Sequence, residues 1–236
     1  MGKRTALVLG GGAGGVVAAN TLRRHLPSTD RVVVVDREPN HLFAPSLLWL
    51  MIGNRSSKQI SRPLNRLAMK GIDFIQGSVE KIDPENRNVV IDGEPNSADA
   101  LIIALGADLA PEVIPGLENS GHNLFTLEGA SAIRDSLESF GGGRIVIITA
   151  EPLYKCPAAP YEASMLIEHR CRKLGIRDKV QIELYAAEPG PMGVAGKEVS
   201  QAVRNMVESR GIGYSPEHKI REVDSESKEL IFSDHQ

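Results

Sequence analysis

The feature that most constrains this 236-residue chain is a glycine-rich turn that directly follows its first apolar run. Gly10, Gly12 and Gly15 have the spacing G-x-G-x-x-G. In a strand–turn–helix unit the first glycine permits the tight turn, the second lets backbone approach a pyrophosphate, and the third lets the helix pack closely on the strand. A second apolar run ends in Asp36, where an acid can accept hydrogen bonds from ribose hydroxyls. The first 36 residues therefore predict a dinucleotide-binding βαβ unit.

The residues beside this turn complete the predicted binding site. Ala13 and Gly14 lead into a helix expected over 14–25, whose N-terminal N–H groups would face the pyrophosphate. Asp36 argues against a cofactor with a 2′-phosphate, although Arg37 beside it keeps that alternative open. This unit alone does not distinguish NAD from FAD.

Composition narrows the class of protein. A net charge of −3 without any basic tract argues against a nucleic-acid partner. Two cysteines cannot build a disulfide framework, and the six histidines have no metal-ligand spacing, so no metal site is expected. The longest apolar stretch, 47–52, is too short to span a bilayer, and the first strand begins too close to Met1 for a signal peptide, so we expect a cytoplasmic protein.

Beyond residue 36 the chain alternates strand-like and helix-like segments. This pattern predicts an α/β fold of two Rossmann-like dinucleotide-binding-type domains with parallel sheets, 1–112 and 113–236, joined near Pro111, Pro115 and Gly116. A turn-rich segment 38–53 and an extended stretch 54–70 come first. Strands are then expected at 73–79, 98–107, 144–149, 180–186, 219–223 and 229–232, with an antiparallel hairpin of 78–82 and 88–91. Helices are expected at 128–140, 160–174 and 197–209.

The second half lacks the signal that opens the first. There is no glycine between Gly143 and Gly175, and Pro152 and Pro157 remove N–H donors that a phosphate would use. The domain 113–236 is therefore expected to have no phosphate cradle for a nicotinamide dinucleotide. A chain with one dinucleotide site of this kind is expected to hold FAD.

Four further segments produce a family resemblance. The turn Ala104-Leu105-Gly106, in place of the usual A-T-G, and the segment 114–117 resemble the pyridine nucleotide disulfide reductase superfamily of flavoproteins. Within it, the segments 41–53 and 155–162 resemble sulfide:quinone oxidoreductases and the flavoprotein subunit of flavocytochrome c sulfide dehydrogenase. The similarity covers nearly the whole chain, and 155–162, which reads K-C-P-A-A-P-Y-E, is its most specific part.

The resemblance implies roles for individual residues. Cys156 would be one of a redox pair that accepts sulfide sulfur beside the flavin, its partner lying in a C-terminal region beyond Gln236, so that the chain is a fragment or a shortened homologue. Glu162 would handle protons, unless it only complements the helix dipole. The FAD would be non-covalent, and its further contacts are expected at Pro45, Ser46, Val79, Leu105, Gly106 and Ala107.

The two cysteines are expected to differ. A single cysteine is often only a small buried hydrophobe. Cys156 would precede a helix N-terminus and follow Lys155, which both favour a thiolate. Cys171 lies about eleven residues into that helix, too far for a disulfide, and is expected to be structural.

Three functions remain open at this point. The resemblance favours an FAD-dependent oxidoreductase that oxidises sulfide or a related sulfur compound and passes electrons to quinone or a cytochrome. A type II NADH dehydrogenase shares a similar early loop, 43–45, but needs a nicotinamide site. The third is a nucleotide-binding scaffold without turnover. Peripheral membrane association of the intact protein and a homo-oligomer stay compatible with the sequence.

Overall fold

The computed structural model describes residues 3–233 and divides into two compact units. The first unit contains the residues up to Ala44 together with Ser57–Leu109, and the second contains Pro45–Ser56 together with the residues from Ala110 onward. These units differ from the domains expected from the sequence chiefly in the segment 45–56, which precedes the predicted boundary at 112 by more than fifty residues yet packs with the second unit.

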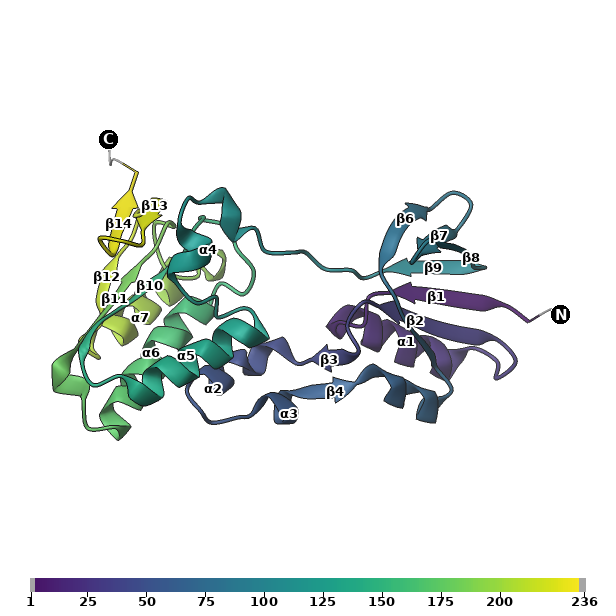
Figure 1. The fold of residues 1–236 in the computed structure, drawn as a ribbon, viewed down its shortest axis with the longest axis horizontal. Helices are drawn as coiled ribbons and strands as arrows, with labels where there is room; N and C mark the ends of the chain where they lie inside the picture. The colour runs from purple at the N-terminus through teal and green to yellow at the C-terminus, as the bar shows by residue number, and fades with distance from the viewer. Residues whose placement is uncertain (1–2, 234–236) are drawn as a thin grey trace. The chain divides into compact units, whose positions relative to one another are not determined.

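The first unit is built on a parallel four-stranded sheet with the order β5-β2-β1-β9 (Figure 1). Its strands are β1 (Thr5–Leu9), β2 (Arg31–Asp36), β5 (Asp73–Gln76) and β9 (Ala100–Ile103). The helix α1 (Ala13–His25) connects β1 to β2. Because all four strands are parallel, the carboxyl ends of β1, β2 and β9 meet at one edge of the sheet, which is where open α/β sheets bind ligands.

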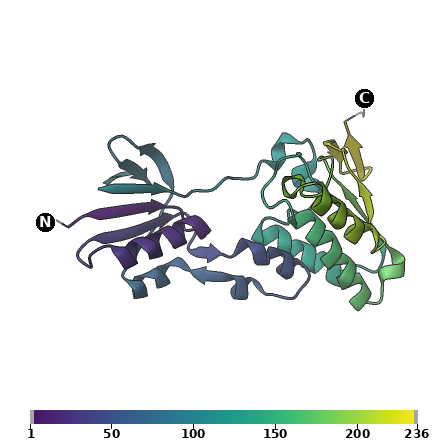
Figure 2. The same cartoon turned by 180° about the vertical axis from the view of Figure 1, so that it is seen from behind.

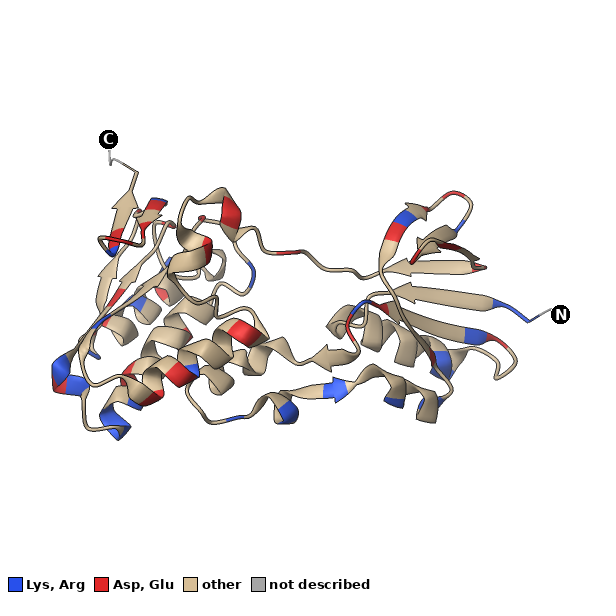
Figure 3. Cartoon of the chain, in the orientation of Figure 1, with Lys and Arg blue, Asp and Glu red and all other residues tan. Residues whose placement is uncertain are grey.

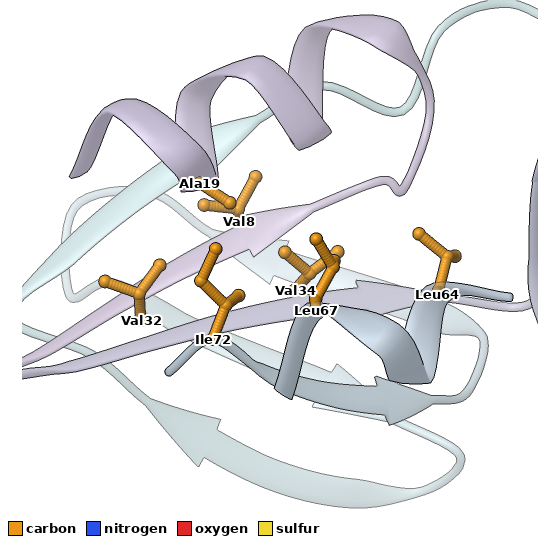
Figure 4. Packing of buried hydrophobic residues seen from close by; sticks show 7 residues of the cluster. All are labelled: Val8, Ala19, Val32, Val34, Leu64, Leu67 and Ile72. Carbon is orange, nitrogen blue, oxygen red and sulfur yellow. The ribbon is translucent and has the colours of Figure 1, made fainter. Parts of the chain in front are cut away.

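Alternating side chains of the sheet form two separate cores. On one face, Val8 and Val34 pack with Ala19 of α1 and with Leu67 and Ile72 (Figure 4). On the other face, odd-numbered residues of β1 and β2 pack against Val89 and Ile91. The central strands are therefore apolar on both faces, as strands covered on both sides must be.

The rest of the first unit consists of short elements around this sheet. The antiparallel strands β6 (Val79–Asp83), β7 (Asn88–Ile91) and β8 (Glu94–Ser97) form a second sheet, and β3 (Asn40–Leu42) pairs with β4 (Ser61–Pro63). The helix α3 (Ser57–Ile60) precedes β4, and the 3₁₀ helix η2 (Leu64–Lys70) follows it.

The second unit has a parallel sheet with the order β10-β11-β12, accompanied by helices (Figure 2). Its main elements are β10 (Gly143–Ile148), α6 (Ala159–Lys173), β11 (Val180–Tyr185), α7 (Lys197–Glu208), β12 (Gly213–Ser215), α5 (Leu127–Ser139), α4 (Leu117–Ser120) and the antiparallel pair β13 (Ile220–Asp224) and β14 (Glu229–Phe232). The helix α2 (Leu47–Met51) packs against α5 and α6, which explains why 45–56 belongs to this unit.

The predicted α/β class with parallel sheets is confirmed. The hairpin of 78–82 with 88–91 is confirmed as β6 and β7. Sequence reading missed β8, which contains Pro95, and β12, which is three residues long and contains Gly213. Neither has the β-branched alternation that marks a strand; both are stabilised by pairing with a neighbouring strand.

Charged residues occur in both units (Figure 3). The segment from Ser57 to Lys70 contains basic residues but no acidic ones. One of them, Arg62, donates from Nη1 to the carbonyl oxygens of Lys58 and Ser61, so it stabilises the connection between α3 and β4. Within the described residues no helix has both the length and the apolar character needed to cross a membrane.

The burial pattern predicts unequal effects for two identical substitutions in the first unit. Val34 is completely buried, whereas Val17 on α1 is 65% exposed. Val34→Ala should lower the free energy of unfolding by about 2–3 kcal/mol, because it removes two buried methyl groups and leaves a cavity. Val17→Ala should change it by less than about 0.5 kcal/mol. Urea unfolding followed by circular dichroism measures both, and equal effects would contradict the described core.

Candidate functional site

Two of the three motif glycines are required by the packing of the chain itself. Gly10 has φ +105° and its N–H donates to the carbonyl oxygen of Val35 at 2.7 Å. A Cβ on Gly10 would lie 2.3 Å from the carbonyl oxygen of Ala104, and a Cβ on Gly15 would lie 1.7 Å from that of Gly10. These contacts bring β1, α1 and the turn after β9 together at the carboxyl edge of the sheet.

Gly12 is different, because a Cβ there would meet no atom within 4 Å. Gly12 is exposed, is the N-cap residue of α1, and accepts a hydrogen bond from the Val16 N–H at 3.0 Å. Ala13 and Gly14 beside it are also exposed, and the first turn of α1 has no acidic residue. The N–H groups at this helix end thus face open space, and the residues fit the pyrophosphate of a dinucleotide.

Asp36 orders the turn from the end of β2. Its Oδ2 accepts the Gly11 N–H at 2.5 Å, and its Oδ1 accepts the Glu38 N–H at 2.8 Å. A carboxylate has about four acceptor directions, so capacity remains for ribose hydroxyls. Asp36 is half-buried at the same edge of the sheet as the glycine turn.

The neighbouring Arg37 is turned toward the segment after β9. Its Nη2 donates to Asp108 Oδ1 at 3.1 Å. Asp108 directly follows the expected FAD-contacting residues Leu105, Gly106 and Ala107, all of which are exposed, with Gly106 at φ +75°. The structure therefore brings Arg37 and these three residues, two segments distant in sequence, to one place in the first unit.

Three residues that contact or form the glycine turn, Gly11, His41 and Leu64, were not identified as its supports from the sequence. A Cβ on Gly11 would lie 2.5 Å from Leu64 Cδ1 and 3.1 Å from Asp36 Oδ2, so a larger residue there would require these side chains to shift. The ring Nδ1 of His41 lies 2.8 Å from the Gly11 carbonyl oxygen, and this contact gives His41 a structural role. Gly11 occupies an x position of the G-x-G-x-x-G motif, where no particular residue is specified, and Leu64 is far away in sequence. The sequence pattern therefore indicated neither role.

The remaining expected contacts lie elsewhere. Val79 begins β6 and packs in the core with Val89 and Ile91. Pro45 is exposed and Ser46 half-buried at the end of the 3₁₀ helix η1 (Ala44–Ser46), and both belong to the second unit. Their roles in binding stay predictions.

In the second unit, Cys156 lies in the loop between β10 and α6. It is a free, exposed thiol with φ +57°, a left-handed conformation that costs a residue with a side chain about 1–2 kcal/mol. Its carbonyl oxygen accepts the Ala159 N–H of α6 at 2.9 Å. The strand β10 ends at Ile148, and Cys156 precedes the helix α6, as expected from the sequence.

The side chains near Cys156 differ in their surroundings. Lys155 places its Nζ 5.5 Å from the ring centroid of Phe125, a cation–π contact. Glu162 is exposed in the first turn of α6 and borders an open groove with His169 and Arg172. Cys171 is completely buried in α6, and burial raises the pKa of its thiol, so it is inert as expected.

The second unit also contains a buried carboxylate that sequence reading missed. Glu188 is 7% exposed and follows β11. Its Oε1 accepts the hydroxyls of Tyr154 at 2.5 Å and Tyr161 at 2.6 Å, and its Oε2 accepts the hydroxyl of Thr149 at 2.6 Å. We call these four residues the Glu188 cluster. Glu188 lies three residues beyond β11, whereas Asp36 is the last residue of β2. An acid close to the end of the second strand of a βαβ unit is the signal that could have identified Glu188.

The hydroxyl groups of both tyrosines in the Glu188 cluster donate hydrogen bonds to Glu188. Burial, and after it the hydrogen bond to Glu188, raises the pKa of Tyr154 and of Tyr161 well above the ordinary value for tyrosine. The phenols therefore remain protonated at every physiological pH. The buried carboxylate near the end of β11 therefore accepts its hydrogen bonds from the chain's own hydroxyl groups.

Comparison with known proteins connects these features to one family. The family model described as pyridine nucleotide-disulphide oxidoreductase matches residues 4–236. The mitochondrial sulfide:quinone oxidoreductase of Dictyostelium discoideum is 28% identical over 96% of this chain and 51% of its own length. The crystal structure of the sulfide:quinone oxidoreductase from Aquifex aeolicus has a TM-score of 0.87 and 29% identity, covering 98% of this chain and 54% of that one.

A more distant relative belongs to another class. The type II NADH:quinone oxidoreductase of Staphylococcus saprophyticus is 22% identical over 90% of this chain and 56% of its own length. The chain thus spans about half the length of the curated relatives it matches.

The glycine turn supplies a matched pair of substitutions. Gly12 has φ −69° and open space around it, so Gly12→Val should fold with nearly unchanged stability yet lose the expected FAD, because its side chain occupies the space of the pyrophosphate. Gly15→Ala should instead destabilise the fold, because its Cβ collides with the Gly10 carbonyl. Flavin content after gel filtration and the thermal midpoint separate the two; a Gly12→Val protein that retains its flavin would refute the assignment.

Proposed function

We propose that this chain, which belongs to the pyridine nucleotide-disulphide oxidoreductase family, is the dinucleotide-binding and thiol-bearing part of a flavin-dependent sulfide oxidoreductase that reduces quinone. The observation that carries this proposal is the exposed Cys156 at the start of α6, in a chain whose only glycine-rich phosphate turn belongs to the other unit. The relatives named as sulfide:quinone oxidoreductases support the substrate class.

The cofactor is FAD, since the family and these relatives are FAD-binding flavoproteins. This confirms the cofactor expected from the sequence. Bound FAD supplies a two-electron acceptor that can be reoxidised by a quinone. In the first unit, Gly12 and the helix end of α1 would hold the pyrophosphate, and Asp36 the adenosine ribose.

The chemistry assigned to Cys156 is sulfur transfer. In the overall reaction HS⁻ loses two electrons and becomes zero-valent sulfur, while the quinone gains two electrons and two protons to become a quinol. A cysteine thiolate can bind that sulfur, whereas a hydroxyl cannot. Glu162, four residues into α6 and exposed, is proposed to exchange the protons. A cytochrome as acceptor in place of quinone remains the alternative.

A type II NADH dehydrogenase is the second candidate, favoured by the distant relative of that class. It requires a nicotinamide site in the second unit. The loop between β10 and α6 has no glycine, and the acid that follows β11, Glu188, is already bound by three hydroxyls of the same unit. These observations favour sulfide over NADH as the electron donor.

The proposal predicts which donor reduces the flavin and which cysteine is needed. Anaerobic sulfide should bleach the visible absorption of the FAD-loaded protein when the C-terminal region expected to carry the partner cysteine is present, and NADH should not. Cys156→Ser should retain FAD and slow sulfide-dependent bleaching by about 100-fold or more, because serine cannot carry sulfur. Cys171→Ala, the matched control at the buried cysteine, should bleach at the unaltered rate. Bleaching by NADH, or full activity of Cys156→Ser, would overturn the proposal.

A further inference from the structure

The loop that displays Cys156 is attached on both sides to one buried side chain. Tyr154, two residues before Cys156, and Tyr161, five residues after it, donate to the same oxygen atom, Glu188 Oε1. The start of the loop is attached as well, because Thr149 donates to Glu188 Oε2 and its own hydroxyl oxygen accepts the Ala187 N–H at 2.8 Å. A single carboxylate thereby joins the beginning and the middle of this loop to the first turn of the helix α6 that follows it.

Two further contacts of this loop lie at the surface: Glu151 pairs with Lys219 at 2.7 Å, and Lys155 lies against the Phe125 ring. Leu153 is 89% exposed, and Glu151, Pro152, Lys155 and Cys156 are exposed as well. Few apolar contacts and exposed backbone are the properties of segments that open easily. Cys156 nevertheless has a left-handed backbone conformation, which persists only where the surroundings impose it.

We propose that Glu188 is a positioning residue for Cys156, which holds the loop in the conformation that presents the thiol at the start of α6. This inference rests on the proposed function only in taking Cys156 as the reacting thiol. Glu188 does not touch the thiol in this arrangement; it acts through Tyr154 and Tyr161. An acid at the end of the second strand of a βαβ unit serves ribose binding in a nucleotide-binding unit, whereas Glu188, three residues beyond β11, supports the loop of the thiol.

The substitutions that test this role differ in what they leave behind. Glu188→Ala removes the acceptor of all three hydroxyls. Glu188→Gln keeps a carbonyl oxygen for the two tyrosines, and its amide can donate to Thr149 in place of accepting from it. Tyr154→Phe removes only the attachment just before Cys156. Glu168→Ala is the matched control, because Glu168 is an equally buried glutamate of α6 that pairs with Arg172 and Arg177 and has no contact with this loop.

The first readout is tryptic cleavage after Lys155, which lies in the loop and next to Cys156. In the native protein Glu188→Ala should speed this cleavage by about tenfold or more, since cleavage needs the loop to open. Tyr154→Phe should speed it to a smaller extent. Glu188→Gln should remain within about threefold of the unaltered protein, and Glu168→Ala should leave this site as slow as in the unaltered protein even if its melting temperature falls.

The second readout is the alkylation rate of Cys156 by iodoacetamide, measured by mass spectrometry with the buried Cys171 as internal reference. In Glu188→Ala the alkylation rate of Cys156 should converge on that of the same chain unfolded in urea, and Glu188→Gln should restore the native rate.

Neither readout uses sulfide or flavin, so a failure of sulfide oxidation would leave this inference intact. Should Glu188→Ala not fold, Tyr154→Phe decides. Unchanged cleavage and alkylation in Tyr154→Phe, or equal effects of Glu168→Ala and Glu188→Ala at matched stability, would overturn it.

Discussion

The close approach of backbone segments at the carboxyl end of β1 is the constraint on which the first unit depends. The Gly10 and Gly15 backbones meet with no room for a methyl group between them, and the turn after β9 lies against Gly10 in the same way. This close packing brings three segments to one edge of the sheet: the end of β2, the start of α1 and the residues from Leu105 to Ala107. Between the two packed glycines, a Cβ on Gly12 would meet no atom within 4 Å, so the N-terminal end of α1 is open.

Each unit has an acid near the carboxyl end of the second strand of a βαβ unit. Asp36 is the last residue of β2 and accepts the Gly11 N–H, whereas Glu188 lies three residues beyond β11 and accepts the Thr149 hydroxyl. Asp36 keeps acceptor capacity at a half-buried position. Glu188 is buried and also accepts hydrogen bonds from two tyrosine hydroxyls. Burial and local donors thus leave acceptor capacity on Asp36 and occupy Glu188 with hydroxyl groups of its own unit.

This difference explains how one architecture can serve a cofactor in one half and a thiol in the other. A phosphate cradle requires backbone N–H groups, which glycine supplies and proline removes. The loop around Cys156 contains Pro152 and Pro157 and depends instead on side-chain hydroxyls that converge on a carboxylate. Side-chain attachment leaves the tip of the loop exposed, and that is where the thiol lies.

The sequence by itself determined the fold class, the glycine turn with its acid, and the contrast between an exposed and a buried cysteine, because spacing, strand apolarity and helix periodicity are local properties. It could not place 45–56 in the second unit, find β8 and β12, or identify Gly11, His41 and Leu64 as supports of the turn. Each of these depends on partners distant along the chain. The Glu188 cluster is the clearest case, since Thr149 and Glu188 are 39 residues apart and their hydrogen bond exists only because β10 and β11 pair side by side. Tertiary structure alone decided that this acid is occupied by the protein's own hydroxyls, because a carboxylate buried without those donors would carry a large desolvation cost.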